Sequence, residues 1–572
     1  MTQASSRDRW HERPGGFQRP LVLLLGCLGV GLAHAQDRGS DAALADSARR
    51  IEADVRFLAD DLLEGREAGT RGYDLAALYV ATRFRSIGLQ PAGEDGTYFQ
   101  SVPLVRGVRE KDGAKLVVTR DGVATELRFQ QEFLPGNDYE TGKCSLSGTP
   151  MVFVGQGVVA PELGHDDLKG VDVRGKVAVL LSNAPSRFPN DQRAFYADYA
   201  EKARELERRG AVGVISVGDP EEEKKYPWSV WTANWARPGM RLIGPDGRPI
   251  DTFPGIRCVA VVPAAQAEVL FAGSPHRAAA VFSMLAKDKL ESFDLEGTVT
   301  MQSRTTLSRL TTRHVIARVP SRADSASPVG TTDAALAREN VVFTAHLDHV
   351  GIGAPVDGDA IYNGAQDNAV GMAAMLEAGR MLMRDSTRLR RSVLLVATAA
   401  EEKGLLGAQY FATFPTVPAE SMVANVNLDM PTHIAEVTDL IPVGIEHSTL
   451  GAVTERAVRL AGLTLTPDPM PEEVSFVRSD QYPFVRVGVP AVYLWSGIKR
   501  KDGADGLEAV FAWMKQHYHK PSDDLNRPID WLGAARLARV NYAIALEIAT
   551  QEERPAWNEG NFFGEKFGRR AR

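Results

Sequence analysis

The stretch from Asn340 to Glu402 most constrains the fold, because two short apolar runs in it flank a helical pattern. Val341–Thr344 and Ser392–Thr398 are apolar and rich in β-branched residues, which predicts two buried strands. Between them, Ala369–Met383 predicts a helix. This strand–helix–strand order is typical of an open α/β sheet, in which sites form at the carboxyl ends of the strands.

Acidic and imidazole side chains lie at these predicted strand ends and in the turn before the helix. They are His346, Asp348, Asp367, Glu401 and Glu402. Carboxylates together with imidazoles are ligands that suit zinc-type ions. His346 and Asp348 also fit the pattern of a metal-bound imidazole oriented by a carboxylate. The sequence therefore predicts a metal site, and we expect it to hold two ions.

Each of these residues also has an ordinary structural interpretation. Asp367 is well placed to cap the predicted helix. The pair Glu401–Glu402 resembles a solvated acidic turn, although it follows a buried strand. Adjacent carboxylates repel each other unless a cation is present. With a metal bound, one glutamate would be a ligand and the other would act as general base toward water.

Two further candidates lie later in the chain. Asp429 ends the predicted strand Val423–Leu428, and its alternative role is a plain turn residue. His519 lies in a loop marked by proline and serine, where His517 is a competing ligand. His433 is another competitor, four residues after Asp429. The five signals together are stronger than any one of them.

Five motifs occur in a fixed order: AHLDHVG, NGAQDNAVG, AAEE, NLDM and YHKPSDD. In them the sequence resembles the co-catalytic zinc aminopeptidases, metallopeptidase family twenty-eight, over roughly residues 310–550. The resemblance implies two zinc ions. His346 and Asp429 would bind one ion, Glu402 and His519 would bind the other, and Asp367 would bridge them.

The resemblance also implies the remaining roles. Glu401 would be the general base, and Asp348 would orient His346. Tyr518 would help to stabilise the oxyanion. The peptide bond between Asp367 and Asn368 would be cis. Gln481 departs from the family pattern, because many relatives have histidine at this position. The departure concerns the substrate pocket and not the metal ligands.

Two other segments extend the resemblance over nearly all of the mature chain. LADDLLEGREAGTRGYDLAA is similar to the opening segment of secreted members, and FVGQGVVAPELGHDDLKGVDVRGKVAVLL is similar to a protease-associated domain. The implied fold is an α/β three-layer sandwich with a mixed central sheet and a smaller inserted β-rich domain. The expected parts are a signal peptide (1–35), peptidase segments (36–131 and 297–551), the inserted domain (132–296) and a tail (552–572).

The N-terminus predicts export. Arginines precede the apolar run Leu21–Leu32, which is too short to span a bilayer well, and Ala33–Ala35 fits a signal-peptidase site. We therefore expect a secreted or periplasmic protein without stable membrane insertion. Cys27 also fits a lipoprotein signal, which we hold as the alternative. In an oxidising compartment Cys144 and Cys258 either pair or stay as two small buried side chains.

Composition excludes some classes of partner. The chain has 572 residues, a net charge of −7 and a pI near 6.0, so we expect two or three domains and no nucleic-acid binding. Trp228, Trp231 and Trp235 predict local packing, with an aromatic flap over the cleft as the alternative. The polar and basic tail from Glu552 predicts a surface arm.

The function that follows is a zinc-dependent exopeptidase, expected to be an aminopeptidase acting on peptide substrates. One alternative is a carboxypeptidase of the glutamate-carboxypeptidase type, which needs arginines such as Arg478 or Arg486 facing a terminal carboxylate. A second is a relative of glutaminyl cyclase with one zinc ion. A third is a non-catalytic relative, which would have lost ligands that this sequence retains.

Overall fold

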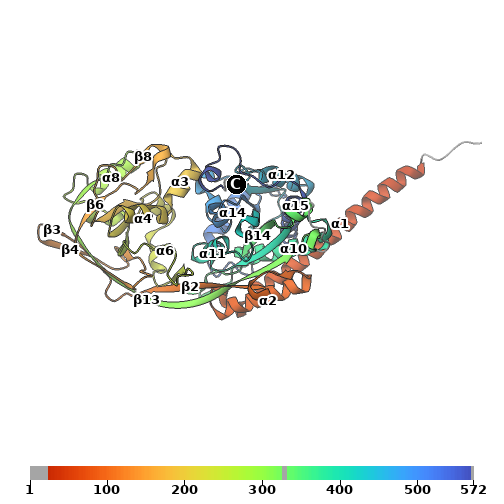
Figure 1. Cartoon of the computed structure of the whole chain (residues 1–572), viewed down its shortest axis with the longest axis horizontal. Helices are drawn as coiled ribbons and strands as arrows, with labels where there is room; N and C mark the ends of the chain where they lie inside the picture. The colour runs from red at the N-terminus through yellow and green to blue at the C-terminus, as the bar shows by residue number, and fades with distance from the viewer. Residues whose placement is uncertain (1–22, 325–331, 569–572) are drawn as a thin grey trace, which may run out of the picture.

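The computed structural model describes residues 23–324 and 332–568. The chain forms two lobes that stand side by side, and the long strands β2 (Phe99–Arg109) and β13 (Phe293–Val319) run from one lobe into the other (Figure 1). The two strands pair antiparallel from Thr305 to Val315 of β13. Strand β13 therefore belongs to the sheets of both lobes.

The first lobe contains a mixed sheet, which we call the peptidase sheet. Its order is β11–β2–β13–β17–β14–β18–β21–β19–β20, and β1 (Gln90–Pro91) pairs with the end of β13. Strands β14, β17, β18 and β21 are parallel, whereas β13 and β19 run antiparallel to their neighbours β17 and β21. The bounds not yet given are β11 (Gly239–Leu242), β14 (Asn340–His346), β17 (Ser392–Thr398), β18 (Met422–Asn427), β19 (Asp439–Val443), β20 (Thr464–Leu465) and β21 (Ala491–Ser496).

Helices cover both faces of the peptidase sheet, as the alternation within its strands requires. In β14, Val341 and Phe343 pack toward one face, while Val342 packs toward the other. The first face is covered by α1 (Leu23–Leu58), α2 (Arg71–Ile87), α10 (Val370–Arg384), α12 (Leu450–Leu460) and α15 (Trp531–Thr550). The second face is covered by α11 (Leu406–Thr413) and α13 (Gln481–Arg486). Each large apolar side chain buried in these layers contributes about 1.5–3 kcal/mol. The predicted α/β sandwich with a mixed sheet is confirmed.

The second lobe is built on another mixed sheet, in the order β4–β3–β13–β6–β9–β10–β12–β5. Helix α4 (Tyr199–Arg208) covers one face, and α7 (Glu268–Phe271) and α8 (Ala278–Leu285) cover the other. The strand bounds are β3 (Lys115–Arg120), β4 (Val123–Leu127), β5 (Leu134–Pro135), β6 (Lys143–Phe153), β9 (Val177–Leu181), β10 (Gly213–Val217) and β12 (Cys258–Val262). Cys144 in β6 and Cys258 in β12 form a disulfide, so the paired alternative holds.

Sheet membership does not follow the predicted limits at 131/132 and 296/297. Strands β3 and β4 precede residue 132 but lie in the second sheet, and β11 falls inside 132–296 but lies in the peptidase sheet. Strand β13 crosses the limit at 296/297 without a break. The assignment of 132–296 to a protease-associated domain stays a prediction.

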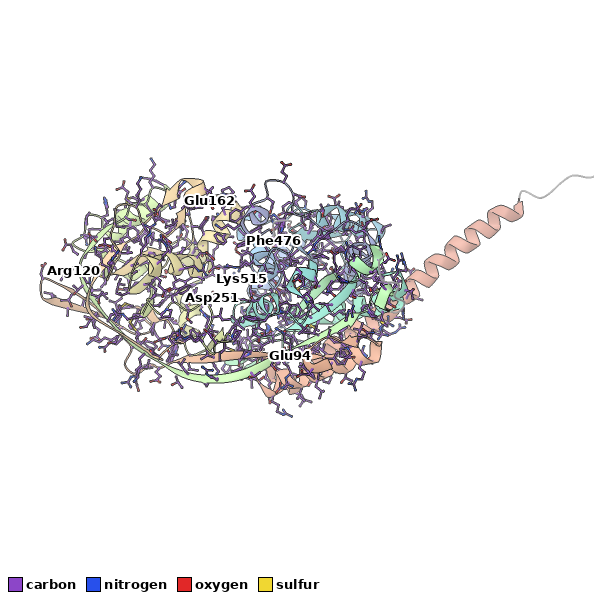
Figure 2. The ribbon with its side chains drawn as sticks, viewed as in Figure 1. Glu94, Arg120, Glu162, Asp251, Phe476 and Lys515 are labelled. Carbon is purple, nitrogen blue, oxygen red and sulfur yellow. A yellow bond between two sulfur atoms is a disulfide. The ribbon has the colours of Figure 1, made fainter. Side chains whose placement is uncertain are left out.

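The C-terminal tail is not a surface arm, and this expectation was wrong. Residues Phe562–Phe567 form α16, and Phe563 is fully buried against Phe476 and Tyr482 of the first lobe. Phe562 and Phe567 contact Phe195 of the second lobe. The apolar residues of the tail are few but gather on one short helix. Figure 2 labels Glu162 and Phe476 on the two sides of this contact between lobes.

The predicted helices form, with shifts at their ends. The helix expected at Ser47–Leu63 is the end of α1, which stops at Leu58. It stops there because the Asp60 side chain caps the 3-10 helix that follows at Asp61–Arg66. The first 22 residues of the predicted signal peptide lie outside the described residues. Within the described ranges, no helix combines the length and apolar character needed to cross a bilayer.

Candidate metal centre

Three neighbouring parallel strands end at the candidate site. His346 is the last residue of β14 and is paired in register with Thr398, the last residue of β17. The chain after β17 turns sharply at Glu401–Lys403, and the chain after β18 reaches Asp429 two residues beyond Asn427. Because the carboxyl ends of parallel strands meet at one edge, these groups converge from distant parts of the sequence.

Asp367 comes from a tight turn rather than from a strand. The turn Ala365–Ala369 leads directly into α10, and the Asp367–Asn368 peptide bond is cis, as expected. Asn368 Nδ2 donates to the Leu428 carbonyl oxygen at 2.9 Å, and Asn368 Oδ1 accepts from the Met430 N–H at 3.1 Å. Asn368 therefore ties the Asp367 turn to the backbone on both sides of Asp429.

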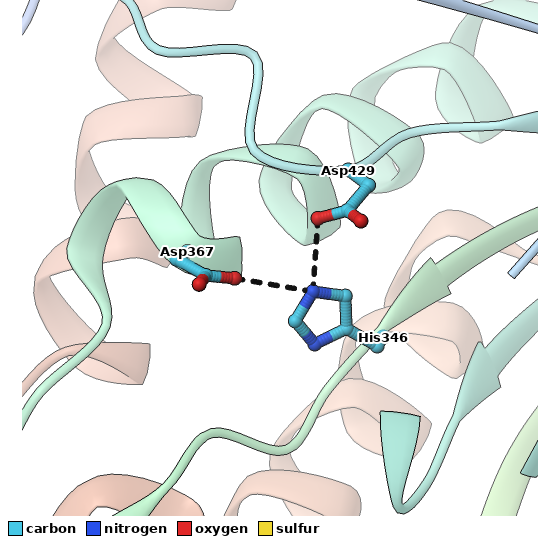
Figure 3. A group of neighbouring side chains, drawn as sticks. All are labelled: His346, Asp367 and Asp429. Atoms are coloured by element: carbon cyan, nitrogen blue, oxygen red, sulfur yellow. Dashed lines mark hydrogen bonds and ion pairs between the residues drawn. The ribbon is translucent and has the colours of Figure 1, made fainter. Parts of the chain in front are cut away.

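The first donor group consists of His346, Asp367 and Asp429 (Figure 3). The Nε2 atom of His346 lies 3.0 Å from Asp429 Oδ1 and 3.3 Å from Asp367 Oδ1. The other ring nitrogen, Nδ1, donates to the Asp348 carbonyl oxygen at 3.0 Å, which leaves the Nε2 lone pair facing two carboxylates. Such an arrangement needs a proton or a cation between the three groups.

The second donor group shares Asp367. The Nε2 atom of His519 lies 3.2 Å from Asp367 Oδ2 and 3.1 Å from Glu402 Oε2. Asp367 thus presents one oxygen to His346 and the other to His519. All five predicted ligands lie together, and the arrangement of Asp367 is that of a carboxylate between two sites.

His349 joins the second group, although the sequence analysis missed it. Its ring is fully buried, with Nδ1 2.7 Å from Glu402 Oε1 and 3.9 Å from Asp367 Oδ2. His349 Nδ1 and Glu402 Oε1 are not oriented to form a hydrogen bond with each other. Neither atom has another hydrogen-bond partner among the described residues. The motif HLDH contains a second histidine three residues after His346, and that spacing was the available signal.

Asp348 has contacts that differ from those expected. Its backbone carbonyl, not its carboxylate, contacts His346. The carboxylate accepts from the backbone N–H groups of Glu401 at 3.1 Å and Glu402 at 3.3 Å. Burial raises the pKa of Asp348 to about 6. In this structure Asp348 holds the turn that carries both glutamates.

Glu401 and Tyr518 are placed beside the donor groups and are not part of them. Burial raises the pKa of Glu401 well above its usual range, and the neighbouring carboxylates of Asp429 and Glu402 raise it further. The Tyr518 ring stacks on His519 with centroids 3.9 Å apart. Burial and the nearby carboxylates raise the pKa of Tyr518 well above 10, so its hydroxyl keeps its proton.

Several buried groups that the sequence analysis did not single out hold the site together. Asp523 accepts from the N–H groups of Gln366 at 2.9 Å and Asp367 at 3.1 Å, and burial raises its pKa to about 7. The buried Arg66 guanidinium donates to backbone carbonyls that include Leu347 and Gly364. Gln481, where the family pattern has histidine, accepts from Asn427 Nδ2 at 2.8 Å and is fully buried, so it supports β18.

The competing candidates lie elsewhere. His517 contacts Ser522 at 2.9 Å, and His433 is buried with its backbone bonded to Gln366. Neither belongs to a donor group. Arg486 pairs with Glu201 at 2.9 Å and Asp198 at 3.4 Å of the second lobe, and Arg478 pairs with Glu473 at 3.2 Å.

These donors fit divalent zinc-type ions, because imidazole nitrogens and carboxylate oxygens lie within ligand distance of one another. The family model described as peptidase family M28 matches residues 329–545, which contain every donor named above. Residues 329–545 therefore form an M28 peptidase domain. The match confirms the resemblance seen in the five motifs.

Solved structures are similar over most of the chain. An aminopeptidase from Aneurinibacillus sp. strain AM-1 has a TM-score of 0.50 at 18% identity, and the match covers 88% of this chain and 93% of that one. BSAP, a zinc aminopeptidase from Bacillus subtilis, has a TM-score of 0.42 at 18% identity, covering 88% and 95%. A peptidase M28 precursor from Shewanella amazonensis SB2B has a TM-score of 0.40 at 16% identity, covering 89% and 98%. At this identity the likeness to the Aneurinibacillus enzyme establishes the fold of the chain and not its specificity.

Proposed function

We propose that the protein is a secreted or periplasmic aminopeptidase that uses two zinc ions to remove N-terminal residues from peptides. One observation carries the proposal: Asp367 presents its two oxygens to two imidazoles, His346 and His519, that belong to separate donor groups. In the proposal His346 and Asp429 hold one ion, Glu402 and His519 hold the other, and Asp367 is shared. The resemblance to the co-catalytic members of the family supports these assignments.

When bound, the zinc ions would polarise the scissile carbonyl and lower the pKa of the attacking water. Glu401 accepts the proton of that water, since its carboxylate lies beside both donor groups and accepts no other hydrogen bond among the described residues. Glu401 then passes the proton to the leaving amine. Asp348 keeps Glu401 in place through the backbone N–H groups of the turn.

Tyr518 donates a hydrogen bond from its hydroxyl group to the developing oxyanion. Its raised pKa keeps the proton on the phenol, and its stacking on His519 fixes the ring at the edge of the site. A well-placed donor of this kind is worth about 3–4 kcal/mol in the transition state. The surplus of carboxylates attracts a protonated or metal-bound α-amine, which favours a free N-terminus.

The alternatives receive less support from the described residues. The two arginines considered for a carboxypeptidase, Arg478 and Arg486, are each paired with acidic side chains. A one-zinc enzyme of the glutaminyl-cyclase type would need only one of the two donor groups. A non-catalytic relative would lack donors, whereas all five predicted ligands converge here beside Glu401.

Leucine p-nitroanilide and its N-acetyl derivative test the proposal. The zinc-loaded protein should hydrolyse the first and not the second, and metal analysis should give two zinc ions per chain. If the protein instead removes C-terminal residues from N-blocked peptides, it is a carboxypeptidase and the aminopeptidase assignment is wrong. A stoichiometry of one ion would overturn the two-zinc assignment.

A further inference from the structure

Arg237 lies close to two elements that lead into the metal centre, although it belongs to the chain segment between β10 and β12. It lies two residues before β11, which joins the edge of the peptidase sheet. Met240 of β11 packs with Ala400, the residue before Glu401, in one buried cluster. Strand β11 therefore lies against the turn that carries both catalytic-site glutamates.

The side chain of Arg237 contacts a second element, the hairpin that follows His349. Its guanidinium lies over the Tyr362 ring, 4.9 Å from the centroid. A Cβ atom added to Gly353 would lie 2.8 Å from Arg237 Nη2, so the guanidinium rests on the backbone of the hairpin β15 (Gly351–Val356) and β16 (Asp359–Tyr362). In that hairpin Tyr362 pairs with Gly351, two residues after His349.

Arg237 thus sits between the Glu401 turn and the hairpin that follows His349. The Glu401 turn carries Glu402 and the hairpin follows His349, and these two residues meet in the second donor group, where His349 Nδ1 lies 2.7 Å from Glu402 Oε1. The next residue, Pro238, restricts the Arg237 backbone to extended conformations. The guanidinium is consequently held in place by its backbone and by an aromatic ring.

The charge of Arg237 is not neutralised within the described residues. Its guanidinium makes no hydrogen bond or ion pair there, and its contact with Tyr362 is apolar and electrostatic. The neighbouring cations are occupied: Lys403 donates to Glu67 at 2.7 Å, and Arg66 is buried among backbone carbonyls. A half-buried guanidinium with free donors on the hairpin that follows His349 matches the planar geometry of a carboxylate.

We propose that Arg237 binds the C-terminal carboxylate of short peptide substrates, so that the second lobe selects peptides of about two to four residues. The inference rests on the proposed aminopeptidase function. The length follows from reach: Gly353 is four residues from His349, a span of at most about 14 Å, and an extended peptide advances about 3.3–3.6 Å per residue. The N-terminal peptide bond can then lie at the metal centre while the carboxylate meets Arg237.

Paired substrates test this role. We would measure kcat/KM for Leu-Gly, Leu-Gly-Gly and Leu-Gly-Gly-Gly, each with a free carboxylate and as the C-terminal amide. Leucine p-nitroanilide serves as a substrate without a carboxylate. The variants are Arg237→Gln and Arg237→Lys, and Arg248→Gln is the matched control, an exposed arginine six residues after β11.

Arg237→Gln should lower kcat/KM about 10–100-fold for at least one free-carboxylate peptide, as expected for a charged hydrogen-bonded pair. It should change the matching amide and the anilide by less than about threefold. Arg237→Lys should recover part of the loss, since it keeps the charge without the planar fork. Arg248→Gln should behave as wild type.

An equal loss on the acids, the amides and the anilide would overturn the proposal and make Arg237 a latch between lobes. An unchanged preference for free carboxylates in Arg237→Gln would overturn it as well. If the wild-type protein hydrolyses all substrates equally, the carboxylate site is wrong but the aminopeptidase stands. If it hydrolyses none of them, the proposed function itself fails.

Discussion

The Nδ1 atom of His349 lies 2.7 Å from Oε1 of Glu402, inside the second donor group and away from solvent. The other Glu402 oxygen faces His519 at 3.1 Å, so each oxygen of this carboxylate meets a different imidazole. The rings of His349 and His519 meet edge to face with centroids 5.6 Å apart. Glu402 is therefore fixed from two sides, and one of its two partners is outside the motif-derived ligand set.

We predict that His349→Leu weakens the binding of one zinc ion about 10–100-fold and leaves the other unchanged, as loss of an outer partner of a ligand typically does. The measurement is a zinc titration of chelator-treated protein against a competing chelator. His433→Leu is the matched control, because His433 is equally buried but belongs to neither donor group. Two unchanged zinc affinities in His349→Leu would show that His349 only fills space.

Glu401→Gln should bind both zinc ions with wild-type affinity and lose about 10²–10⁴-fold in kcat on leucine p-nitroanilide. The amide keeps the shape of the side chain but cannot accept the proton of the attacking water. Zinc content is checked alongside the rate, so that a loss of metal is not mistaken for a loss of the base. A variant with near wild-type turnover would refute the role of Glu401.

Sequence patterns located the donors because each follows a buried strand or a marked turn. The runs that end at His346, Glu401 and Asp429 are apolar and short, so their carboxyl ends were visible in the chain. The expected contact of the Asp348 carboxylate with His346 does not form, because β14 ends at His346 and the chain then turns toward Glu401. His349 was missed for a similar reason: only the fold brings it against Glu402.

Other features depend on tertiary pairing that the sequence does not display. Strand β13 alternates many threonine, serine and arginine side chains, which resembles a polar linker until β2, β3 and β6 pair with it. Arg237 itself gave no signal, since its neighbours Tyr362 and Gly353 lie more than a hundred residues away in the sequence. The tail was misjudged from its polar composition, which hid three phenylalanines on one short helix.

His314 should make the protein less stable in mild acid. Its Nδ1 accepts from the Ala399 N–H at 3.2 Å in a fully buried position, and burial lowers its pKa to about 3. The unfolded chain, with a histidine pKa near 6.5, binds more protons below that pH. The free energy of unfolding should fall by about 1.4 kcal/mol per pH unit from pH 6.5 toward pH 3.

Urea unfolding of chelator-treated protein at pH 7.5 and pH 5 measures this effect. The loss between the two pH values should be smaller in His314→Gln than in wild type by about 2 kcal/mol, because glutamine does not titrate. His276→Gln is the control, since His276 is half-buried in the second lobe. An identical pH dependence in His314→Gln and wild type would contradict the assignment.

Phe563 should anchor the C-terminal tail and join the lobes. Its ring is fully buried against Phe476 and Tyr482, and on the same helix Phe567 reaches Phe195 of the second lobe. Truncating a buried phenylalanine to alanine typically destabilises by about 3–5 kcal/mol. Phe563→Ala should therefore release α16, so that limited proteolysis cleaves the tail faster than in wild type.

The matched control is Leu460→Ala, since Leu460 is 83% exposed and its truncation should change little. If the tail of Phe563→Ala resists protease as the wild-type tail does, the helix is held by other contacts and Phe563 is not its anchor.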